Sequence, residues 1–350
     1  MVKRNLYVLT LEPIETRYTK QWYMFWKSEF KKFFNVIYVD GYSTDVDITD
    51  VILDGKFLDI NMTNVWKAEQ IKKVGLLFSK KQIKDSDIFI FMDAWNFGVT
   101  AIKYMIQLNN MKCKMYGYWH AGTYDPADFT AQAGLGSWAS HDEVAWLLAL
   151  DGNFVATQFH KDLILKSYNY SNIEKKIYVV GFPLDWKKYI ANSLTEKKNI
   201  KNKENIVVFP HRLDTEKHPE VFDKISLQFR NYKFIKTLEV TKTKTDYYNL
   251  LAKSKIVFSA SKQETFGIGT VEAMMLGCIP IVPNELSYKE MYDDMFKYEN
   301  GCGARSKMEY AMNHYGQNNH MMNVLKENQE KIQKQSMKAI PKMAIHMLRK

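Results

Sequence analysis

Residues 256–283, IVFSASKQETFGIGTVEAMMLGCIPIVP, decide the fold class of this chain. The segment has the pattern of an apolar strand, a polar loop with two glycines, a helix and a second apolar strand, which is the repeating unit of a parallel sheet. Gly267 and Gly269 allow the backbone to come close to a ligand. A helix that begins near Thr270 would direct its unpaired N–H groups and the positive end of its dipole to the same place. The segment therefore predicts an anion site beside a parallel sheet.

Short apolar runs alternate with helical stretches over the rest of the chain, and this pattern predicts an α/β fold with two doubly wound, Rossmann-like domains. A lysine-rich polar stretch separates the two series and predicts a linker at residues 186–204. The expected domains are residues 1–185 and 205–310, followed by a helical segment at 311–350. The expected strands are residues 6–10, 36–39, 88–92, 115–119, 154–156, 177–180, 206–209, 233–237, 256–260 and 279–282.

The helix expected over residues 18–34 has an apolar face rich in aromatic residues. Trp22, Phe30 and Phe34 recur at helical spacing, with Lys27 and Lys31 beside them. The pattern fits a crossover helix that buries this face on the sheet, and it also fits a helix that lies on a membrane surface. The position of the segment directly after the first strand favours the crossover helix.

Composition and charge limit the class of protein. The chain has 350 residues, of which 46% are hydrophobic and 25% charged, so it can form one or two globular domains. Because no apolar run approaches the ~18 residues of a spanning helix and no Cys-x-x-Cys pair occurs, a soluble cytoplasmic protein is expected. The net charge is +10: residues 1–180 hold 21 Lys and Arg against 20 Asp and Glu, and residues 181–350 hold 28 against 19. Phosphate-bearing ligands, nucleic acid or a solvated lysine surface would each account for the excess.

Charged residues follow two expected strands of the second domain. Glu264 and Glu272 bracket the glycine loop with seven residues between them, so both carboxylates can accept hydrogen bonds from the hydroxyl groups of one ligand. Alternatively, Glu272 interacts with its own helix dipole and Glu264 is a solvated loop charge. Arg212 and Lys217 lie five residues apart in a strand-to-helix loop and can reach one diphosphate from two sides, unless they are solvated surface residues.

Together these motifs resemble the Glu-x7-Glu signature of retaining, GT-B-fold glycosyltransferases of family 4. The residues that match that pattern are Ser259, Glu264, Phe266, Gly267, Glu272, Ala273, Met274, Gly277, Pro280 and Val282. The loop at residues 209–218 resembles the family's G-R-L-x2-E-K-G loop, with His211 and His218 in place of its two glycines. The resemblance implies two domains that face a central cleft and a segment at 311–350 that packs back on the N-terminal domain.

The resemblance also implies roles for individual residues. Glu264 would contact hydroxyl groups of the donor sugar, Glu272 would hold the nucleotide ribose, and Arg212 and Lys217 would neutralise the departing diphosphate. His120, at a strand end, resembles a histidine that contacts the donor sugar in relatives, and it is otherwise a packing residue. The expected catalytic residues are His120, Arg212, Lys217 and Glu264, and the expected donor-binding residues are Arg212, Lys217, Glu264, Thr265, Phe266, Gly267, Ile268 and Glu272.

Acceptor-binding residues are expected after the strands of the first domain, where open α/β sheets place ligands. The candidates are Asp93, Trp119, Tyr124 and Asp125. The aspartates can instead start turns, and the aromatic residues can instead pack in the core. The expected donor is a nucleoside diphosphate sugar, most simply a UDP sugar. No metal or other cofactor is expected, because cationic side chains can stabilise the departing diphosphate.

The sequence therefore predicts a retaining hexosyl- or pentosyltransferase that uses a nucleotide sugar. One acceptor is a 5-hydroxymethylated base in phage DNA, which the positive charge and the richness in Lys, Asn, Ile, Tyr and Phe favour, although residues 1–180 are nearly neutral. Duplex DNA would then be a partner and the host cytoplasm the location. The alternatives are transfer to a cell-surface polysaccharide or lipid-linked glycan, and an inactive nucleotide-sugar-binding module. The oligomeric state stays open.

Overall fold

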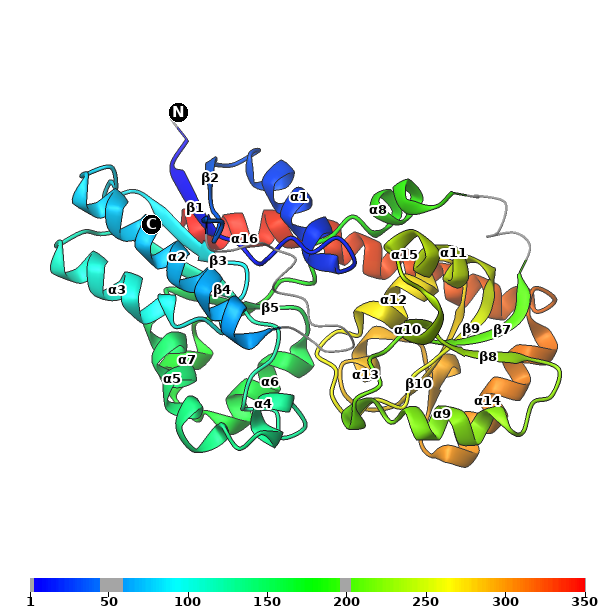
Figure 1. Cartoon of the computed structure of the whole chain (residues 1–350). Coiled ribbons are helices and arrows are strands. Elements are labelled where there is room, and N and C mark those ends of the chain that lie inside the picture. Colours follow the sequence, from blue (N-terminus) through cyan, green and yellow to red (C-terminus); the bar gives the residue numbers. More distant parts are fainter. Residues whose placement is uncertain (1–2, 45–58, 196–202, 350) are drawn as a thin grey trace. The chain divides into compact units, whose positions relative to one another are not determined.

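The computed structural model describes residues 3–44, 59–195 and 203–349. The chain divides into two compact units, each built on a parallel sheet that helices cover on both faces (Figure 1). Unit 1 comprises Met1–Ala156, His160–Pro183 and Lys338–Lys350, and unit 2 comprises Thr157–Phe159 and Leu184–Met337. The predicted α/β class with two Rossmann-like sheets is confirmed.

Unit 1 has a six-stranded parallel sheet in the order β2-β1-β3-β4-β5-β6. Since β1 has β2 on one side and β3 on the other, the sheet has its switch point there, and ligands are expected at the carboxyl ends of these strands. The strands are β1 (Asn5–Leu9), β2 (Asn35–Val39), β3 (Ile88–Phe91), β4 (Lys114–Tyr118), β5 (Gly152–Val155) and β6 (Ile177–Val179). The helices are α1 (Tyr18–Phe30), α2 (Ile60–Ser79), α3 (Gly98–Leu108), α4 (Phe129–Gln132), α5 (Gly136–Ala149), α6 (Gln158–Ser167), α7 (Ser171–Glu174) and α16 (Ala339–Leu348).

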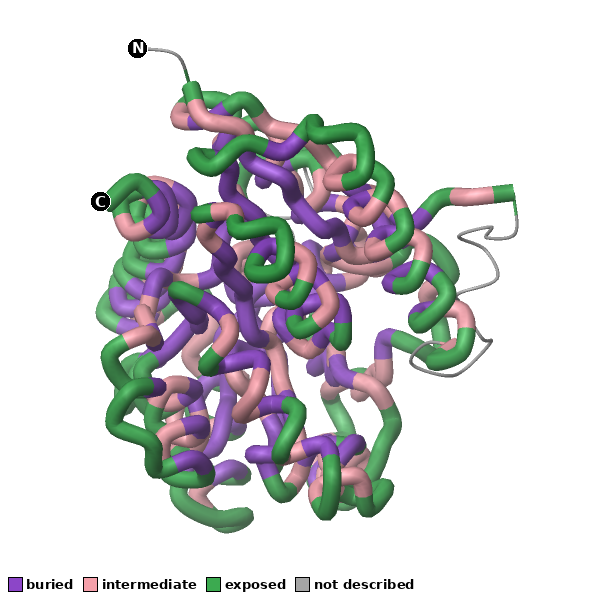
Figure 2. The backbone as a smooth tube through the Cα atoms, turned by 90° about the vertical axis from the view of Figure 1, so that its left-hand side faces the viewer, coloured by how far each residue is buried: buried purple, intermediate pink, exposed green. Residues whose placement is uncertain are grey.

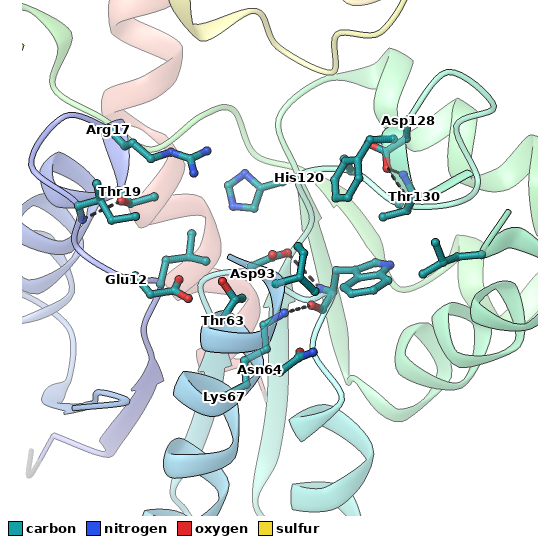
Figure 3. Close-up of a pocket in the computed structure, with 18 of the residues that line it drawn as sticks. Glu12, Arg17, Thr19, Thr63, Asn64, Lys67, Asp93, His120, Asp128 and Thr130 are labelled. Atoms are coloured by element: carbon teal, nitrogen blue, oxygen red, sulfur yellow. Dashed lines mark hydrogen bonds between the residues drawn. The ribbon is translucent and has the colours of Figure 1, made fainter. Parts of the chain in front are cut away.

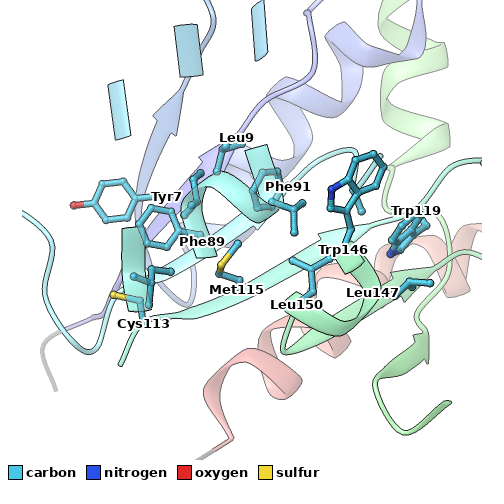
Figure 4. Packing of buried hydrophobic residues seen from close by; sticks show 14 of the residues in the cluster. Tyr7, Leu9, Phe89, Phe91, Cys113, Met115, Trp119, Trp146, Leu147 and Leu150 are labelled. Carbon is cyan, nitrogen blue, oxygen red and sulfur yellow. The ribbon is translucent and has the colours of Figure 1, made fainter. Parts of the chain in front are cut away.

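Successive side chains of these strands point to opposite faces of the sheet, and both faces are apolar. One face carries Phe89 and Met115, which pack in a core with side chains of α2, α3 and α5 (Figure 4). The other face carries Tyr116 and Tyr118, whose partners lie in α16 and α1: the Tyr116 hydroxyl donates to the His346 carbonyl oxygen at 3.3 Å. The inner strands β1, β3, β4 and β5 are largely buried, the edge strand β2 is mostly half-buried, and exposed residues follow the outer helices and loops (Figure 2).

Helix α1 buries its aromatic face inside unit 1. Trp22, Trp26 and Phe30 are fully buried, and the Trp22 ring packs edge-on against Tyr118 of β4 at 5.0 Å between centroids. This face is therefore used in packing on the sheet, as the crossover interpretation predicts, and it is not available to a membrane surface. The helix ends at Phe30, four residues before the predicted end. Over the described residues, no helix is both long and apolar enough to span a membrane.

Unit 2 has a five-stranded parallel sheet in the order β11-β10-β9-β7-β8. Helices α8, α11, α12 and α15 pack together on one face, and α9 and α14 cover the other (Figure 1). Its strands are β7 (Glu204–Phe209), β8 (Lys233–Lys236), β9 (Ser254–Phe258), β10 (Ile279–Pro283) and β11 (Lys297–Tyr298). Its helices are α8 (Trp186–Ser193), α9 (Pro219–Ser226), α10 (Thr237–Val240), α11 (Lys244–Lys253), α12 (Ile268–Met275), α13 (Tyr288–Met291), α14 (Gly301–His314) and α15 (Asn319–Met337), with 3-10 turns at Thr215–Lys217 and Asp294–Phe296.

The structure differs from the expected domain boundaries at both ends of unit 2. Within the expected linker 186–204, residues 186–193 form α8, which packs on α11, α12 and α15, while residues 196–202 lie outside the described residues. Within the expected tail 311–350, α15 buries Leu325 and Ile332 in unit 2, and only α16 belongs to unit 1. Amphipathic helices of this kind can cover either sheet, so their apolar patterns alone do not assign them.

Candidate active site

The candidate donor site lies in unit 2, at the carboxyl ends of β7 and β9. Strand β7 lies between β8 and β9, so this is the switch point of the sheet, where connections leave in opposite directions and open a crevice. The loops that follow these two strands, residues 210–218 and 259–267, carry the expected donor residues. Strand order thereby brings Lys217 to Glu264, although 47 residues separate them in sequence.

Lys217 and Glu264 form a buried ion pair. The Nζ atom of Lys217 donates to Glu264 Oε1 at 3.0 Å, to Gln263 Oε1 at 3.1 Å and to Ser261 Oγ at 3.2 Å, and also to the Gln263 carbonyl oxygen. The two side chains are only 6% and 15% exposed. Burial by itself would raise the pKa of Glu264, but the Lys217 ammonium and the hydrogen bond from His211 outweigh burial and lower that pKa to about 2. Glu264 is therefore ionised throughout the neutral range.

His211 extends this pair. Its Nδ1 lies 3.5 Å from Oε1 of Glu264. Burial lowers the pKa of His211, so the ring is neutral at pH 7 and Nδ1 carries the proton that faces the carboxylate. Its Nε2 is buried and has no hydrogen-bond partner among the described residues. The sequence marked His211 only as a departure from a glycine, whereas the structure places its ring against the donor-site carboxylate.

Arg212 is held within its own loop. Its guanidinium makes ion pairs of 2.9 Å with both Asp214 Oδ2 and Glu216 Oε1. The Arg212 charge also contributes to the lowered pKa of His211, which places the guanidinium near the Lys217 and Glu264 pair. The structure thus gathers two cations, Arg212 and Lys217, and three carboxylates at one sheet edge, where a ligand with both phosphates and hydroxyl groups can bind.

Glu272 lies in a second network, on α12. Its Oε1 accepts hydrogen bonds from Lys244 Nζ and from the Tyr248 hydroxyl, both at 2.7 Å, and its Oε2 accepts from the Tyr247 hydroxyl at 2.9 Å. The three donors share a face of α11, whose first turn is fixed by a capping box between Thr243 and Asp246. The sequence did not single out these donors, although the Thr-x-x-Asp pattern of the capping box was a signal for the helix that presents them.

The glycine loop between β9 and α12 has a tighter structure than predicted. Helix α12 begins at Ile268, two residues before the expected start, with Gly267 in the left-handed conformation at φ +77°. Gly269 consequently lies inside the helix, where a β-carbon would lie 2.7 Å from the Pro210 carbonyl oxygen. Gly269 therefore allows the two donor-site loops to pack closely, in place of the ligand approach expected for it.

The remaining expected donor residues lie along the same loop. The Phe266 ring stacks on Trp186 at 6.0 Å, and the Thr265 carbonyl oxygen accepts a hydrogen bond from the Thr157 hydroxyl at 2.9 Å. Ile268 is the first residue of α12. These contacts hold the loop against its neighbours within unit 2. The first backbone N–H groups of α12, which have no partner within the helix, lie at the end of this loop.

A pocket of about 360 Å³ lies in unit 1, at the switch point of that sheet. The loops after β1, β3 and β4 contribute Glu12, Asp93 and His120, and α2 contributes Thr63 and Lys67 (Figure 3). Other lining residues are Leu11, Ile14, Arg17, Tyr18, Thr19, Ile60, Asn64, Trp95, Ala121, Gly122, Asp128, Phe129, Thr130, Ala133 and Leu135. The loop after β1, which has no glycine and no role in the predictions, thus supplies a wall of this pocket.

His120 lines the pocket with a defined tautomer. Its Nε2 lies 3.0 Å from the Met92 carbonyl oxygen, which can only accept, so Nε2 carries the proton. Its Nδ1 lies 3.3 Å from the Tyr18 hydroxyl and accepts from it. Burial lowers the pKa of His120, so the ring is neutral near pH 7.

Only one of the four expected acceptor residues lines this pocket. Asp93 does so and accepts a hydrogen bond from the Trp95 amide at 3.1 Å. Trp119 is fully buried and donates from its indole to Asn153 Oδ1 at 2.8 Å. Tyr124 is 2% exposed and its hydroxyl lies 2.6 Å from Nε2 of His160. Asp125 starts a turn and accepts from the Ala127 amide at 3.0 Å, so the last three residues serve packing and local structure here.

Comparison with known proteins gives the class of this fold. Residues 220–329 match the family model described as glycosyl transferases group 1. The whole chain superposes on sucrose-phosphate synthase from Thermosynechococcus elongatus with a TM-score of 0.68 at 11% identity, covering 99% of this chain and 97% of the other. Anabaena HepE, solved with UDP and glucose, gives 0.62 at 11% identity, with coverage of 99% and 98%. The fold is therefore GT-B, and residues 220–329 of unit 2 are similar to glycosyl transferases group 1.

One curated relative carries a more specific name. The tRNA-queuosine alpha-mannosyltransferase of Drosophila melanogaster is 26% identical over 167 aligned residues, which are 39% of this chain and 44% of the relative. The chain thus matches less than half the length of that protein.

Proposed function

We propose that this protein is a metal-independent, retaining glycosyltransferase that moves a sugar from a nucleoside diphosphate sugar, most simply a UDP sugar, to an acceptor hydroxyl. The observation that carries the proposal is the buried pair of Lys217 and Glu264 with Arg212 beside it, at the switch point of a unit that matches glycosyl transferases group 1. Anabaena HepE, which has the same fold, was solved with UDP and glucose.

Each donor-site group has a chemical part in this proposal. Glu264, ionised at neutral pH, accepts hydrogen bonds from hydroxyl groups of the donor sugar, and the carboxylate of Glu272 holds the nucleotide ribose. Arg212, Lys217 and the amino end of α12 face the diphosphate. Negative charge grows on the diphosphate as the bond to the sugar breaks, so cations that are already in position stabilise the transition state more than the ground state.

The transfer itself is balanced without an added reagent. The bond between the anomeric carbon and the diphosphate oxygen breaks, and its electron pair stays with the diphosphate. The acceptor oxygen bonds to the anomeric carbon from the same side, and its proton passes to the departing diphosphate oxygen. In this proposal, the neutral side chain of His120 contacts the donor sugar.

A 5-hydroxymethylated base in DNA is the acceptor that we favour. Residues 1–180 have a net charge of +1, but Lys338, Lys342, Arg349 and Lys350 belong to unit 1 and raise its net charge to +5. This removes the main objection to a nucleic acid on that unit, because phosphate contacts need basic residues. The name of the curated relative, a tRNA-queuosine alpha-mannosyltransferase, also refers to a modified nucleoside as acceptor. A hydroxyl group on a modified base is thus the acceptor type with most support.

The decisive experiment is mass analysis of nucleosides after the protein has been incubated with hydroxymethylcytosine DNA and a panel of nucleotide sugars. A hexose or pentose added to hydroxymethylcytosine is expected, and NMR of the product should show the anomeric configuration of the donor. Glu264→Ala and Arg212→Ala should each lower turnover by about 10²-fold or more. Glu285→Ala is the matched control, because that carboxylate is 53% exposed and its one ion pair in the described part of the chain is with Lys262 at 3.0 Å. Unchanged turnover in both site variants would remove the donor-site assignment.

Transfer to a cell-surface polysaccharide or lipid-linked glycan is the second candidate. A gel shift with duplex DNA separates the two, since binding that weakens steeply with salt supports the nucleic acid, and no binding at low salt supports the glycan. An inactive module would bind UDP and neither hydrolyse nor transfer any nucleotide sugar.

A further inference from the structure

The part of the unit 1 pocket that lies between the loop after β1 and α2 is lined by two oxygen atoms that do not use their full hydrogen-bonding capacity. Glu12 is 3% exposed and Thr63 is 8% exposed. Neither Oε1 of Glu12 nor Oγ1 of Thr63 has a hydrogen-bond partner within 3.5 Å among the described residues, although the Thr63 hydroxyl is near enough to the Glu12 carboxyl to lower its pKa. Figure 3 shows both side chains turned toward the same part of the cavity. Buried polar atoms without a partner are rare and costly, so they call for a ligand group that is absent from the free protein.

The charge around these atoms defines what that ligand group is. Asp93 is close enough to Glu12 to raise its pKa, so two carboxyl groups face one cavity. Lys67 and Arg17 are cations that line the same pocket, and the Nζ of Lys67 already donates to the Trp95 carbonyl oxygen at 2.9 Å. A phosphate or carboxylate would meet repulsion from the two acidic side chains. A neutral group with N–H or O–H donors would instead satisfy them.

The state of Glu12 agrees with this requirement. Burial raises the pKa of Glu12, and its own backbone N–H, the Lys67 ammonium and the Thr63 hydroxyl only partly offset the effect. A ligand N–H or O–H group that approached Oε1 would favour the ionised form of Glu12. Its hydrogen bond to the carboxylate would be stronger than one to the protonated acid.

The walls and size of the pocket add a second requirement. Trp95 lines the cavity, and its indole is fixed by a hydrogen bond of 2.8 Å to Glu143 Oε1. Leu11 and Ile14 form apolar surface near Glu12 in the same loop. A volume of about 360 Å³ is at the lower end of the range for ligand pockets, and it fits one ring system with its substituents. A planar or flat ring can therefore pack on Trp95 while its polar edge reaches Glu12.

We propose that Glu12, Thr63 and Asp93 recognise a neutral ring that presents hydrogen-bond donors on its edge, either the amino edge of a nucleobase or the hydroxyl groups of a sugar. This inference rests on the proposed function in one respect, which is that the ring is the acceptor of the transferred sugar. It makes Glu12 and Thr63 specificity-determining residues, and it excludes a phosphate from this end of the pocket.

Binding can be tested by saturation-transfer NMR on the full chain without a nucleotide sugar. The probes are 5-hydroxymethyl-2′-deoxycytidine, methyl α-D-glucopyranoside and methyl phosphate. Glu12→Gln keeps the size of the side chain and removes its charge, and it should weaken the ring that binds by about tenfold or more, the worth of a charge-assisted hydrogen bond. Thr63→Val should weaken the same ring by a smaller factor. Glu15→Gln is the matched control, because Glu15 follows in the same loop with its side chain 82% exposed.

The outcomes are distinct. Glu12-dependent binding of the nucleoside identifies a base, and Glu12-dependent binding of the glycoside identifies a sugar. The proposal is overturned if neither ring binds, if Glu12→Gln binds a ring as well as Glu15→Gln does, or if methyl phosphate binds and is strengthened by Glu12→Gln. Nucleotide-sugar hydrolysis, measured separately, tests the donor site: a wild-type protein that binds the ring but hydrolyses no nucleotide sugar would overturn the proposed function and keep this inference.

Discussion

Replacing Lys217 with methionine tests the central ion pair of the candidate donor site. Methionine fills most of the same space but removes the ammonium group, which contacts Glu264, Ser261 and Gln263. Glu264 then stays in a buried site without its main partner charge. Removing one member of a buried pair is strongly destabilising, because the remaining charge is left uncompensated.

The magnitude follows from the pKa of Glu264, which is about 2 in the folded protein against an ordinary value of 4.5. One pKa unit corresponds to about 1.4 kcal/mol, so the depression contributes about 3 kcal/mol to the stability of unit 2. A depressed carboxyl pKa stabilises the fold above pH 4.5, and this contribution is lost as pH falls from about 4.5 to about 2. Without Lys217, burial is the main influence on Glu264 and raises its pKa. We therefore expect Lys217→Met to lose about 3 kcal/mol at pH 7.

The assay can follow unit 2 alone. Of the eight tryptophans, only Trp186 lies within Leu184–Met337, and it is fully buried. In protein labelled with 5-fluorotryptophan, the ¹⁹F signal of this residue, assigned by its absence in Trp186→Phe, reports urea unfolding of unit 2. Lys262→Met is the control, since that lysine is 56% exposed and its pair with Glu285 contributes about 0–1 kcal/mol. If Lys217→Met and Lys262→Met unfold at the same urea concentration at pH 7, the ion pair does not stabilise unit 2 and the reasoning fails.

Three further predictions concern the same unit. Gly269→Ala would place a β-carbon 2.7 Å from the Pro210 carbonyl oxygen, so it should destabilise unit 2 by about 1–3 kcal/mol in the Trp186 assay, and an unchanged transition would contradict the close packing of the two loops. Glu272→Gln should raise the Kd for UDP, measured by calorimetry, at least tenfold. Equal affinity in wild type and variant would show that Glu272 does not bind the nucleotide. Burial lowers the pKa of His211, so the kcat profile between pH 6 and pH 8 should be the same in wild type and His211→Asn, whereas a step near pH 6.5 that the variant abolishes would show that His211 titrates there.

The ten expected strands could be found from sequence because apolar runs bounded by polar loops are a local signal. The two-residue strand β11 was not expected, since a segment of that length has no periodicity to detect. The end of α1 and the start of α12 were each misplaced, because both depend on backbone geometry at a few residues.

The two loops that carry the expected donor residues are predictable from sequence, because they have characteristic residue types at fixed spacing after a strand. The contacts that those residues make are not predictable in this way. Lys244 and Tyr247 meet Glu272 only because α11 packs beside α12, and His211 meets Glu264 only because β7 and β9 are neighbours. Such contacts depend on sheet order, which the sequence motif does not specify.

The residues expected to bind the acceptor show the opposite case. Asp93, Trp119 and Asp125 all lie at or after strand ends, so the sequence gives them equal standing as acceptor-binding candidates. Alternate residues of a strand point to opposite faces of the sheet, and the Trp119 side chain lies in the core. Glu12 has no signal in the sequence, since its loop has neither a glycine nor a motif.

The sequence by itself thus determined two parallel-sheet units and a set of charged residues that are expected to contact phosphates and sugars, because strand pattern and motif spacing are properties of short segments. The tertiary structure alone decided which charges are paired, which sheet each C-terminal helix covers, and that Glu12 and Thr63 share a pocket. These facts depend on the order of strands and the burial of individual atoms, and burial is what changes the cost of a charge or an unpaired oxygen.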